Sequence, residues 1–335
     1  MKRLYKWLMP VYVALAWMPA AKAQVDPHFS QYYVYPLSLN PGLTGAMEGD
    51  YRVSAIYRNQ WQNVTNAFST VGLSADVTTN KNINIGLSIF NQAAGDGGYR
   101  FTNGYLTVAY NGLAFDREKY KRLAIGIQGG FVNRRFDPSK LQFGDQWFPG
   151  IGYSPTVPTG DGFAKIKAGA FDAGAGLAYY DGTPDQMVSP FGGVSVFHLT
   201  QPGDPFLAGD KEKLPMRFSA HAGARIVLSD ALTLVPNMLY MRQGNAQEKM
   251  AGAYMQFYAG QYTDLLLGAN WRINDAVSPF AGFTYNNFTV GVSYDVNASE
   301  LGKMAKGSNS FEISLTYIGK RRNSVRTDYF KCPRL

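Results

Sequence analysis

The sequence is short of the residues on which most enzymes and disulfide-linked secreted proteins depend. Its single cysteine, Cys332, excludes a disulfide within the chain. Its three histidines, His28, His198 and His221, are scattered, and the sequence contains no Gly-x-Ser-x-Gly motif and no histidine cluster of metal-site type. We therefore expect no enzyme activity, no bound metal and no cofactor.

Long apolar runs are also missing. After residue 23 no stretch of about eighteen apolar residues occurs, so we expect no transmembrane helix. Yet 46% of the residues are hydrophobic, 14% are aromatic and 36 are glycine. This composition suits an outer-membrane β-barrel, whose strands expose only every second residue to lipid. A soluble β-sandwich could share it, so the pattern along the chain has to separate the two folds.

Residues 1–23 have the features of a secretory signal peptide. Basic residues precede a short apolar stretch, and Ala21-Lys22-Ala23 has the small-x-small pattern of a cleavage site before Gln24. The net charge of +8 includes four basic residues of this segment, which leaves +4 (8 − 4) for the exported chain. Much of that charge lies in residues 320–335. Export favours acidic proteins, peptidoglycan or lipid head groups over nucleic acid as partners of this basic tail.

Residues 51–319 contain alternating segments typical of strands. In the clearest one, Val290 and Val292 alternate with Thr289, Gly291 and Ser293. Each segment is near the roughly 9–11 residues that a tilted strand needs to cross a bilayer. The fourteen predicted strands are residues 51–58, 68–79, 82–91, 100–111, 121–136, 168–181, 188–199, 216–229, 231–242, 248–259, 264–273, 276–286, 288–297 and 310–319.

The connections between these segments alternate in length. Short ones, such as 80–81 and 286–287, alternate with a set that includes the long segments 137–167, 200–215 and 298–309. Short periplasmic turns and longer outer loops are the rule for outer-membrane barrels. We therefore predict an all-β fold, a transmembrane antiparallel barrel of fourteen strands, and both termini in the periplasm because the number is even.

Two segments lie outside the predicted barrel. Residues 24–50 show no helix or strand period and contain Pro27, Pro36 and Pro41, which remove backbone donors. Their aromatic content is high, so we expect this periplasmic or lumenal segment to be ordered against the barrel or a partner. Residues 320–335 form a short periplasmic tail whose aromatic residues could anchor it to a partner or to the barrel floor.

These two segments and the first strand carry a family resemblance. The matching residues are Asp26-Pro27-His28-Phe29-Ser30-Gln31-Tyr32, Pro36-Leu37, Leu39-Asn40-Pro41, Thr44-Gly45, Tyr51-Arg52-Val53, Tyr57-Arg58-Asn59-Gln60-Trp61 and Cys332-Pro333-Arg334. With them the sequence resembles the PorP/SprF family of Bacteroidota outer-membrane proteins, associated with type IX secretion and gliding motility. Gly42 stands where the family pattern leads us to expect alanine.

The resemblance implies a platform in the outer membrane. Its partners would be periplasmic and lipoprotein components of the secretion apparatus and a secreted surface protein, or the C-terminal domain of one, in a setting of lipid bilayer and lipopolysaccharide without nucleic acid. The residues that we expect to bind partners are Phe29, Ser30, Gln31, Tyr32, Asn40, Pro41, Arg58, Gln60, Trp61, Tyr329, Phe330, Cys332, Pro333 and Arg334.

Two alternatives remain open at this point. A porin or uptake channel for small solutes would need an open lumen, for which fourteen strands leave room. A surface enzyme is disfavoured, because Arg217, His221 and Arg225 on one face of a predicted strand are better read as a lumen hydrogen-bond network than as a catalytic set.

Overall fold

The computed structural model of the chain describes residues 26–60, 67–79, 81–95, 98–160, 166–203, 213–298 and 309–321. Several predicted features lie outside these described residues, namely the signal peptide, Trp61, and the tail residues Tyr329, Phe330, Cys332, Pro333 and Arg334.

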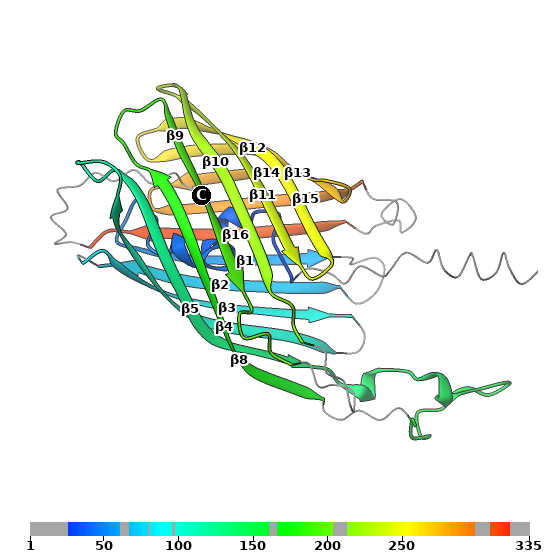
Figure 1. Ribbon diagram of the computed structural model, residues 1–335. Helices are drawn as coiled ribbons and strands as arrows, with labels where there is room; N and C mark the ends of the chain where they lie inside the picture. The colour runs from blue at the N-terminus through cyan, green and yellow to red at the C-terminus, as the bar shows by residue number, and fades with distance from the viewer. Residues whose placement is uncertain are drawn as a thin grey trace, which may run out of the picture.

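Fourteen antiparallel strands close into a barrel, as predicted (Figure 1). The ring closes where the first strand pairs with the last, with Tyr51 opposite Gly319. The strands are β1 (Tyr51–Gln60), β2 (Phe68–Thr78), β3 (Ile83–Ala94), β4 (Tyr99–Ala114), β5 (Lys121–Arg135), β8 (Lys167–Asp181), β9 (Val188–Phe197), β10 (Arg217–Ser229), β11 (Leu232–Gln243), β12 (Ala246–Gly260), β13 (Thr263–Arg272), β14 (Ala276–Tyr285), β15 (Phe288–Asn297) and β16 (Ser310–Gly319).

The alternation in the sequence corresponds to two faces of the barrel wall. On β15 the side chains of Val290 and Val292 are 43% and 48% exposed on the outside, whereas Ser293 is buried in the lumen. The same division holds on β1, where Val53 points outward and Arg52 and Ser54 inward. Lipid outside the barrel requires an apolar outer band. Hydrogen-bonding partners inside the barrel require a polar inner face.

The two ends of the barrel differ in the length of their connections. We call the end that carries turns such as 286–287 the short-turn end, and the other the long-loop end. At the long-loop end residues 136–160 extend beyond the wall as the green loop of Figure 1. This loop contains η3 (Pro138–Lys140), η4 (Gly144–Gln146) and a two-stranded hairpin of β6 (Trp147–Phe148) and β7 (Gly152–Tyr153).

Residues 26–50, which we call the lumen segment, lie inside the ring of strands (blue in Figure 1). The segment folds into short helical turns because its prolines stand at the first position of each: α2 (Pro36–Leu39) and η2 (Pro41–Leu43), preceded by η1 (Tyr32–Val34). None of the helices among the described residues has the length and apolarity needed to cross a lipid bilayer.

The lumen segment runs the full height of the barrel. Asp26 lies at the long-loop end, where its backbone N–H donates to Gln243 Oε1 at 2.6 Å. Asp50 lies at the short-turn end, where its N–H donates to the carbonyl of Gly319 at 2.8 Å. Asp26 and Arg321, the first and last described residues, are therefore at opposite ends of the barrel. The two ends of the exported chain lie outside the described residues, so their location in the periplasm stays a prediction.

The cost of a charge on the outer face should depend on its position along a strand, and β15 allows this to be tested. Val292 and Val296 are 48% and 49% exposed on the same outer face of β15, but Val292 lies near the middle of the strand and Val296 near its end. Val292→Arg should lower the stability of the membrane-inserted barrel by about 2–4 kcal/mol, and Val296→Arg by about 0–1 kcal/mol. Urea-induced unfolding in phospholipid vesicles measures both, and equal losses would place the bilayer elsewhere along the strand.

Candidate functional site

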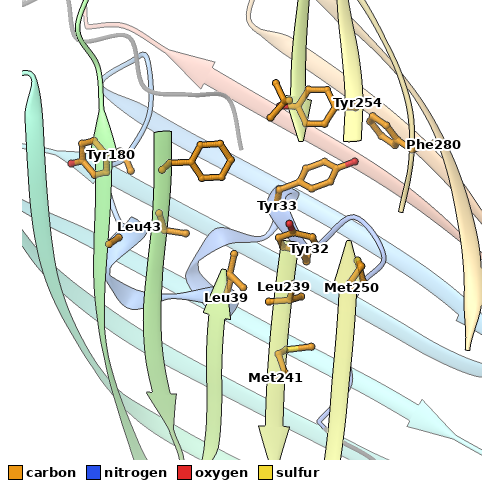
Figure 2. Packing of buried hydrophobic residues seen from close by; sticks show 14 of the residues in the cluster. Tyr32, Tyr33, Leu39, Leu43, Tyr180, Leu239, Met241, Met250, Tyr254 and Phe280 are labelled. Atoms are coloured by element: carbon orange, nitrogen blue, oxygen red, sulfur yellow. The ribbon is translucent and has the colours of Figure 1, made fainter. Parts of the chain in front are cut away.

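The lumen segment fills the barrel with apolar side chains. Tyr32, Tyr33, Leu39 and Leu43 are buried against the inner wall (Figure 2). The ring of Tyr33 lies 5.6 Å from that of Tyr254 and 5.7 Å from that of Phe280. Each such aromatic pair contributes about 0.5–1.5 kcal/mol beyond the burial of area. The wall residues labelled around them are Tyr180, Leu239, Met241, Met250, Tyr254 and Phe280.

A second apolar cluster surrounds Phe29 and Tyr35. Their rings pack edge to face at 5.9 Å, and Phe90 of β3 approaches Phe29 at 6.0 Å. Ile56 of β1 belongs to the same cluster, which explains an apolar residue on the lumen face of that strand. The hydroxyl of Tyr35 donates to the carbonyl of Ile89 at 2.9 Å, so the polar end of this ring also has a partner.

The middle of the segment lies directly against the backbone of the wall. Asn40 Nδ2 donates to the carbonyl of Leu177 on β8 at 2.8 Å. Two wall glycines make this approach possible. A Cβ at Gly126 would lie 2.2 Å from the carbonyl carbon of Pro41, and one at Gly176 would lie 2.0 Å from Asn40 Oδ1. Any side chain at these two positions would therefore push the segment away from the wall.

One buried cluster of charges ties the segment to the seam between β1 and β16. Arg58 donates to Asp295 Oδ2 and to Glu312 Oε1, both at 2.9 Å. The carboxylate of Glu312 also accepts the backbone N–H groups of Ser30 at 2.7 Å and Gln31 at 2.9 Å. Glu312 is fully buried, and its charge is matched by an arginine and two backbone donors, as burial of a carboxylate requires.

A second cluster fixes the other end of the segment. Arg52 donates to both oxygens of Asp76 on β2, from Nε at 3.0 Å and from Nη2 at 2.8 Å. The same carboxylate accepts the N–H of Gly45 at 2.7 Å, and Arg52 donates to the carbonyls of Leu43 and Ala46. Arg52 and Arg58 thus hold the lumen segment at two levels from one strand.

A third cluster holds the start of the segment at the long-loop end. The ring of His198 lies between the carboxylates of Asp26 and Asp172, and Arg217 Nη1 is 3.4 Å from Asp26 Oδ2. Burial alone would lower the pKa of His198, but the charge of Asp26 and the hydrogen bonds from both carboxylates raise it to about 9. Burial would raise the pKa of Asp26, but His198 and Arg217 bring it well below its usual range.

The residues predicted as one lumen network belong to separate levels of the barrel. Arg217, His221 and Arg225 all lie on the inner face of β10, as predicted. Arg217 joins the cluster at the long-loop end, His221 Nε2 lies 3.3 Å from Asn40 Nδ2, and Arg225 donates to the hydroxyl of Tyr258 at 2.9 Å. Positions four apart on a strand are separated by about 13 Å, so the three side chains do not form a single network.

Of the residues predicted to contact partners, most of those that the structure describes lie in the lumen and contact the chain's own wall. Gln60 is only partly buried and lies beside Arg58 at the long-loop end of β1. The residues buried within the barrel are Phe29, Ser30, Gln31, Tyr32, Asn40, Pro41 and Arg58.

Sequence analysis did not single out Asp76, Asp295, Glu312 or Asp172 as anchors of the segment. Each is a carboxylate on a lumen face made mostly of small and polar residues, and a buried charge in such a position needs a counter-charge. The position of each carboxylate on a lumen face could be recognised from the sequence. The residue that pairs with it could not. Among the described residues no group of three His, Cys, Asp or Glu side chains could hold a metal ion.

Two hollows open at the short-turn end, between the lumen segment and the wall. A small apolar cavity of about 70 Å³ is lined by Tyr33, Met47, Leu266, Phe280 and Ile318, among others. A polar cleft of about 490 Å³, partly open to solvent, is lined by residues that include Asp185, Arg225, Asp230 and Tyr258. Glu48 of the lumen segment lines both, so the two hollows adjoin each other.

Removal of Arg58 tests whether the seam cluster holds the protein together. Arg58→Met leaves Asp295 and Glu312 with only Arg272 near them, and the loss of one partner from a buried ion pair costs about 3–5 kcal/mol. We expect urea-induced unfolding to show this loss and Glu312→Gln in the same chain to restore part of it. The exposed Arg100→Met is the control. Unchanged stability in Arg58→Met would show that the cluster is dispensable.

The cluster at the long-loop end predicts a dependence on pH. Since the pKa of His198 is raised from 6.5 to about 9, its contribution to stability is complete below pH 6.5 and is lost as the pH rises through about 9. Since the pKa of Asp26 is lowered from 3.8, its contribution is complete above pH 3.8 and is lost in stronger acid. The barrel should therefore unfold at a lower temperature at pH 10 than at pH 6. The unfolding temperature can be measured from the change in gel mobility that heating causes in folded barrels.

In His198→Gln the same measurement should show a smaller change with pH, because glutamine does not titrate. An equal change in both proteins would assign the pH dependence to other groups.

The comparisons with solved structures concern the fold. The chain is similar to the Ralstonia pickettii toluene transporter TbuX, with a TM-score of 0.50 and 12% identity over 84% of this chain and 92% of that one. It is also similar to the Pseudomonas putida toluene transporter TodX, with a TM-score of 0.52 and 8% identity over 88% of this chain and 98% of that one. At such identities the likeness establishes an outer-membrane barrel fold alone.

The comparisons of sequence give the family. No curated protein sequence matches the chain. The family model described as type IX secretion system membrane protein PorP/SprF matches residues 21–317, which include the whole lumen segment and nearly all of the barrel. The matched region contains Arg52, Arg58 and the segment that they hold. The chain belongs to the PorP/SprF family of type IX secretion system membrane proteins.

Proposed function

We propose that this protein is a fixed platform of the type IX secretion apparatus in the outer membrane. Periplasmic or lipoprotein components of the apparatus bind its short-turn end, and its long loops help to secrete a surface protein or to anchor it at the cell surface. Family membership supports the place in this apparatus.

The observation that carries the proposal is the filled lumen. A fourteen-stranded barrel has room for water inside unless something occupies it. Here Asp26 to Asp50 occupy it from one end to the other, and buried ion pairs of Arg52 and Arg58 hold the segment in place. Such an interior makes the barrel rigid, so its two ends can present binding surfaces of constant shape. A rigid surface loses less conformational entropy when a partner binds.

The orientation follows from the connections. Outer-membrane barrels have short turns in the periplasm and longer loops outside. In this orientation the hairpin of β6 and β7 lies outside the cell, with Trp147 54% and Ile151 80% exposed. Exposed apolar residues on a projecting loop favour contact with another protein. In the same orientation Asp26 lies at the outer surface.

The residues that were expected from the family resemblance to bind partners have different roles in this proposal. The buried ones, among them Ser30, Gln31 and Arg58, position the surfaces that meet partners and do not contact the partners themselves. Gln60, at the long-loop end of β1, and Trp61, which lies outside the described residues, remain proposed partner contacts. The tail residues Tyr329, Phe330, Cys332, Pro333 and Arg334 remain the proposed docking peptide on the periplasmic side.

A porin or uptake channel for small solutes is the second candidate. The apolar cavity lined by Tyr33, Tyr254 and Phe280 favours it, as does the barrel fold shared with two toluene transporters. The lumen segment opposes it, because a solute would have to pass anchored side chains. Planar-bilayer recordings separate the two functions: we expect no stable conductance from the whole protein, whereas a channel for dissolved ions or small solutes would conduct.

The platform function predicts co-purification. Extraction in mild detergent followed by mass spectrometry should recover periplasmic components of the apparatus in stoichiometric amounts with the wild-type chain. A chain in which residues 323–335 are replaced by glycine and serine should insert into the membrane normally but lose most of these partners, together with secretion or surface display. Wild-type recovery from the replaced chain would show that the tail is not the docking element.

A further inference from the structure

The short-turn end has two adjoining hollows beside the point where the described chain ends. The apolar cavity and the polar cleft meet at Glu48, and Ile318 of β16 forms part of the cavity wall. The backbone N–H of Arg321 donates to Asp50 Oδ2 at 2.7 Å, two residues from Glu48 along the lumen segment. The following residues therefore start at the rim of the cavity.

The cleft carries three carboxylates against one cation, Arg225. Glu48, Asp185 and Asp230 all line it. Within the described part of the chain none of these three carboxylates forms an ion pair, and Arg225 in the same cleft donates to Tyr258. A segment that binds here should present basic residues to the cleft and apolar ones to the cavity.

The chain's own C-terminal residues have this chemistry. Residues 322–335 hold four basic side chains, Arg322, Arg326, Lys331 and Arg334, against one acidic side chain, Asp328. Tyr329 and Phe330 stand together among them, and Leu335 is apolar as well.

We propose that Arg326 to Leu335 dock back onto the short-turn end, with Tyr329 and Phe330 packed over the apolar cavity and Arg326 and Lys331 facing Glu48, Asp185 and Asp230. The nine residues after Arg321, up to Phe330, span up to about 30 Å when extended, which is enough to return to a cavity that begins beside Asp50. A tether of this length keeps the segment at an effective concentration of about millimolar, so the chain's own tail competes well against a free peptide of similar sequence.

This inference concerns the barrel without partners. It therefore does not depend on the proposed function, and a purified chain tests it. When the tail is seated, a periplasmic partner would meet a floor composed of both the barrel and its C-terminal residues.

The single cysteine makes a direct test simple. Glu48→Cys places a second thiol at the junction of cavity and cleft, within reach of Cys332 if the tail is seated. Ile151→Cys, at the exposed tip of the long-loop end, is the matched control. Mild oxidation of the purified proteins, followed by digestion and mass spectrometry, should give a disulfide within one chain for Glu48→Cys and none for Ile151→Cys. Equal yields in the two variants, or disulfides only between two chains, would overturn the proposal.

A second measurement does not use the Glu48 variant. A chain truncated after Arg321 should bind a synthetic peptide of residues 322–335, with serine at the position of Cys332, in a saturable way. The full-length chain should bind it weakly, because its own tail occupies the site. Alanine at both Tyr329 and Phe330 of the peptide should weaken binding about tenfold or more. If full-length and truncated chains bind the peptide equally well, the tail does not occupy this site.

Discussion

Charge inside the barrel has to be neutralised, and most of the architecture of this protein depends on that requirement. Arg52 and Arg58 point into the lumen of a barrel whose outside faces lipid, so neither can reach bulk water. Each is matched by carboxylates of the wall and by backbone groups of the lumen segment. An arginine left unpaired in such a site would cost several kcal/mol, so the wall and the segment stabilise each other.

The strands could be predicted from the sequence because their signal is local. A side-chain period of two, as in Thr289, Val290, Gly291, Val292 and Ser293, records which face meets lipid, and it needs no knowledge of the rest of the chain. The ends of strands were less certain: β3 continues to Ala94, three residues beyond its predicted end at residue 91. The fourteen strands and their faces were therefore correct, with differences of a few residues at their ends.

The contents of the lumen could not be predicted in the same way. The segment from Asp26 to Asp50 has no period, and its prolines exclude regular structure without indicating a path. Its contacts join residues that are far apart, such as Arg58 and Glu312, separated by 254 positions. The resemblance identified Arg58 and Gln31 as important residues, but spacing alone could not show that their partners are the wall and not another protein.

The seam of the barrel has a consequence for the order of assembly. Arg58 on β1 stands directly opposite Glu312 on β16, so the residue pair that closes the ring also receives the backbone of Ser30 and Gln31. The N-terminal part of the chain is synthesised first, yet its anchor arrives with the last strand. Contacts between such distant positions form late, because the long chain between them must first be organised. Closure of the wall and anchoring of Ser30 and Gln31 therefore become one late step, whereas the contacts of Arg52 and Asp76 with the other end of the segment require only β1 and β2.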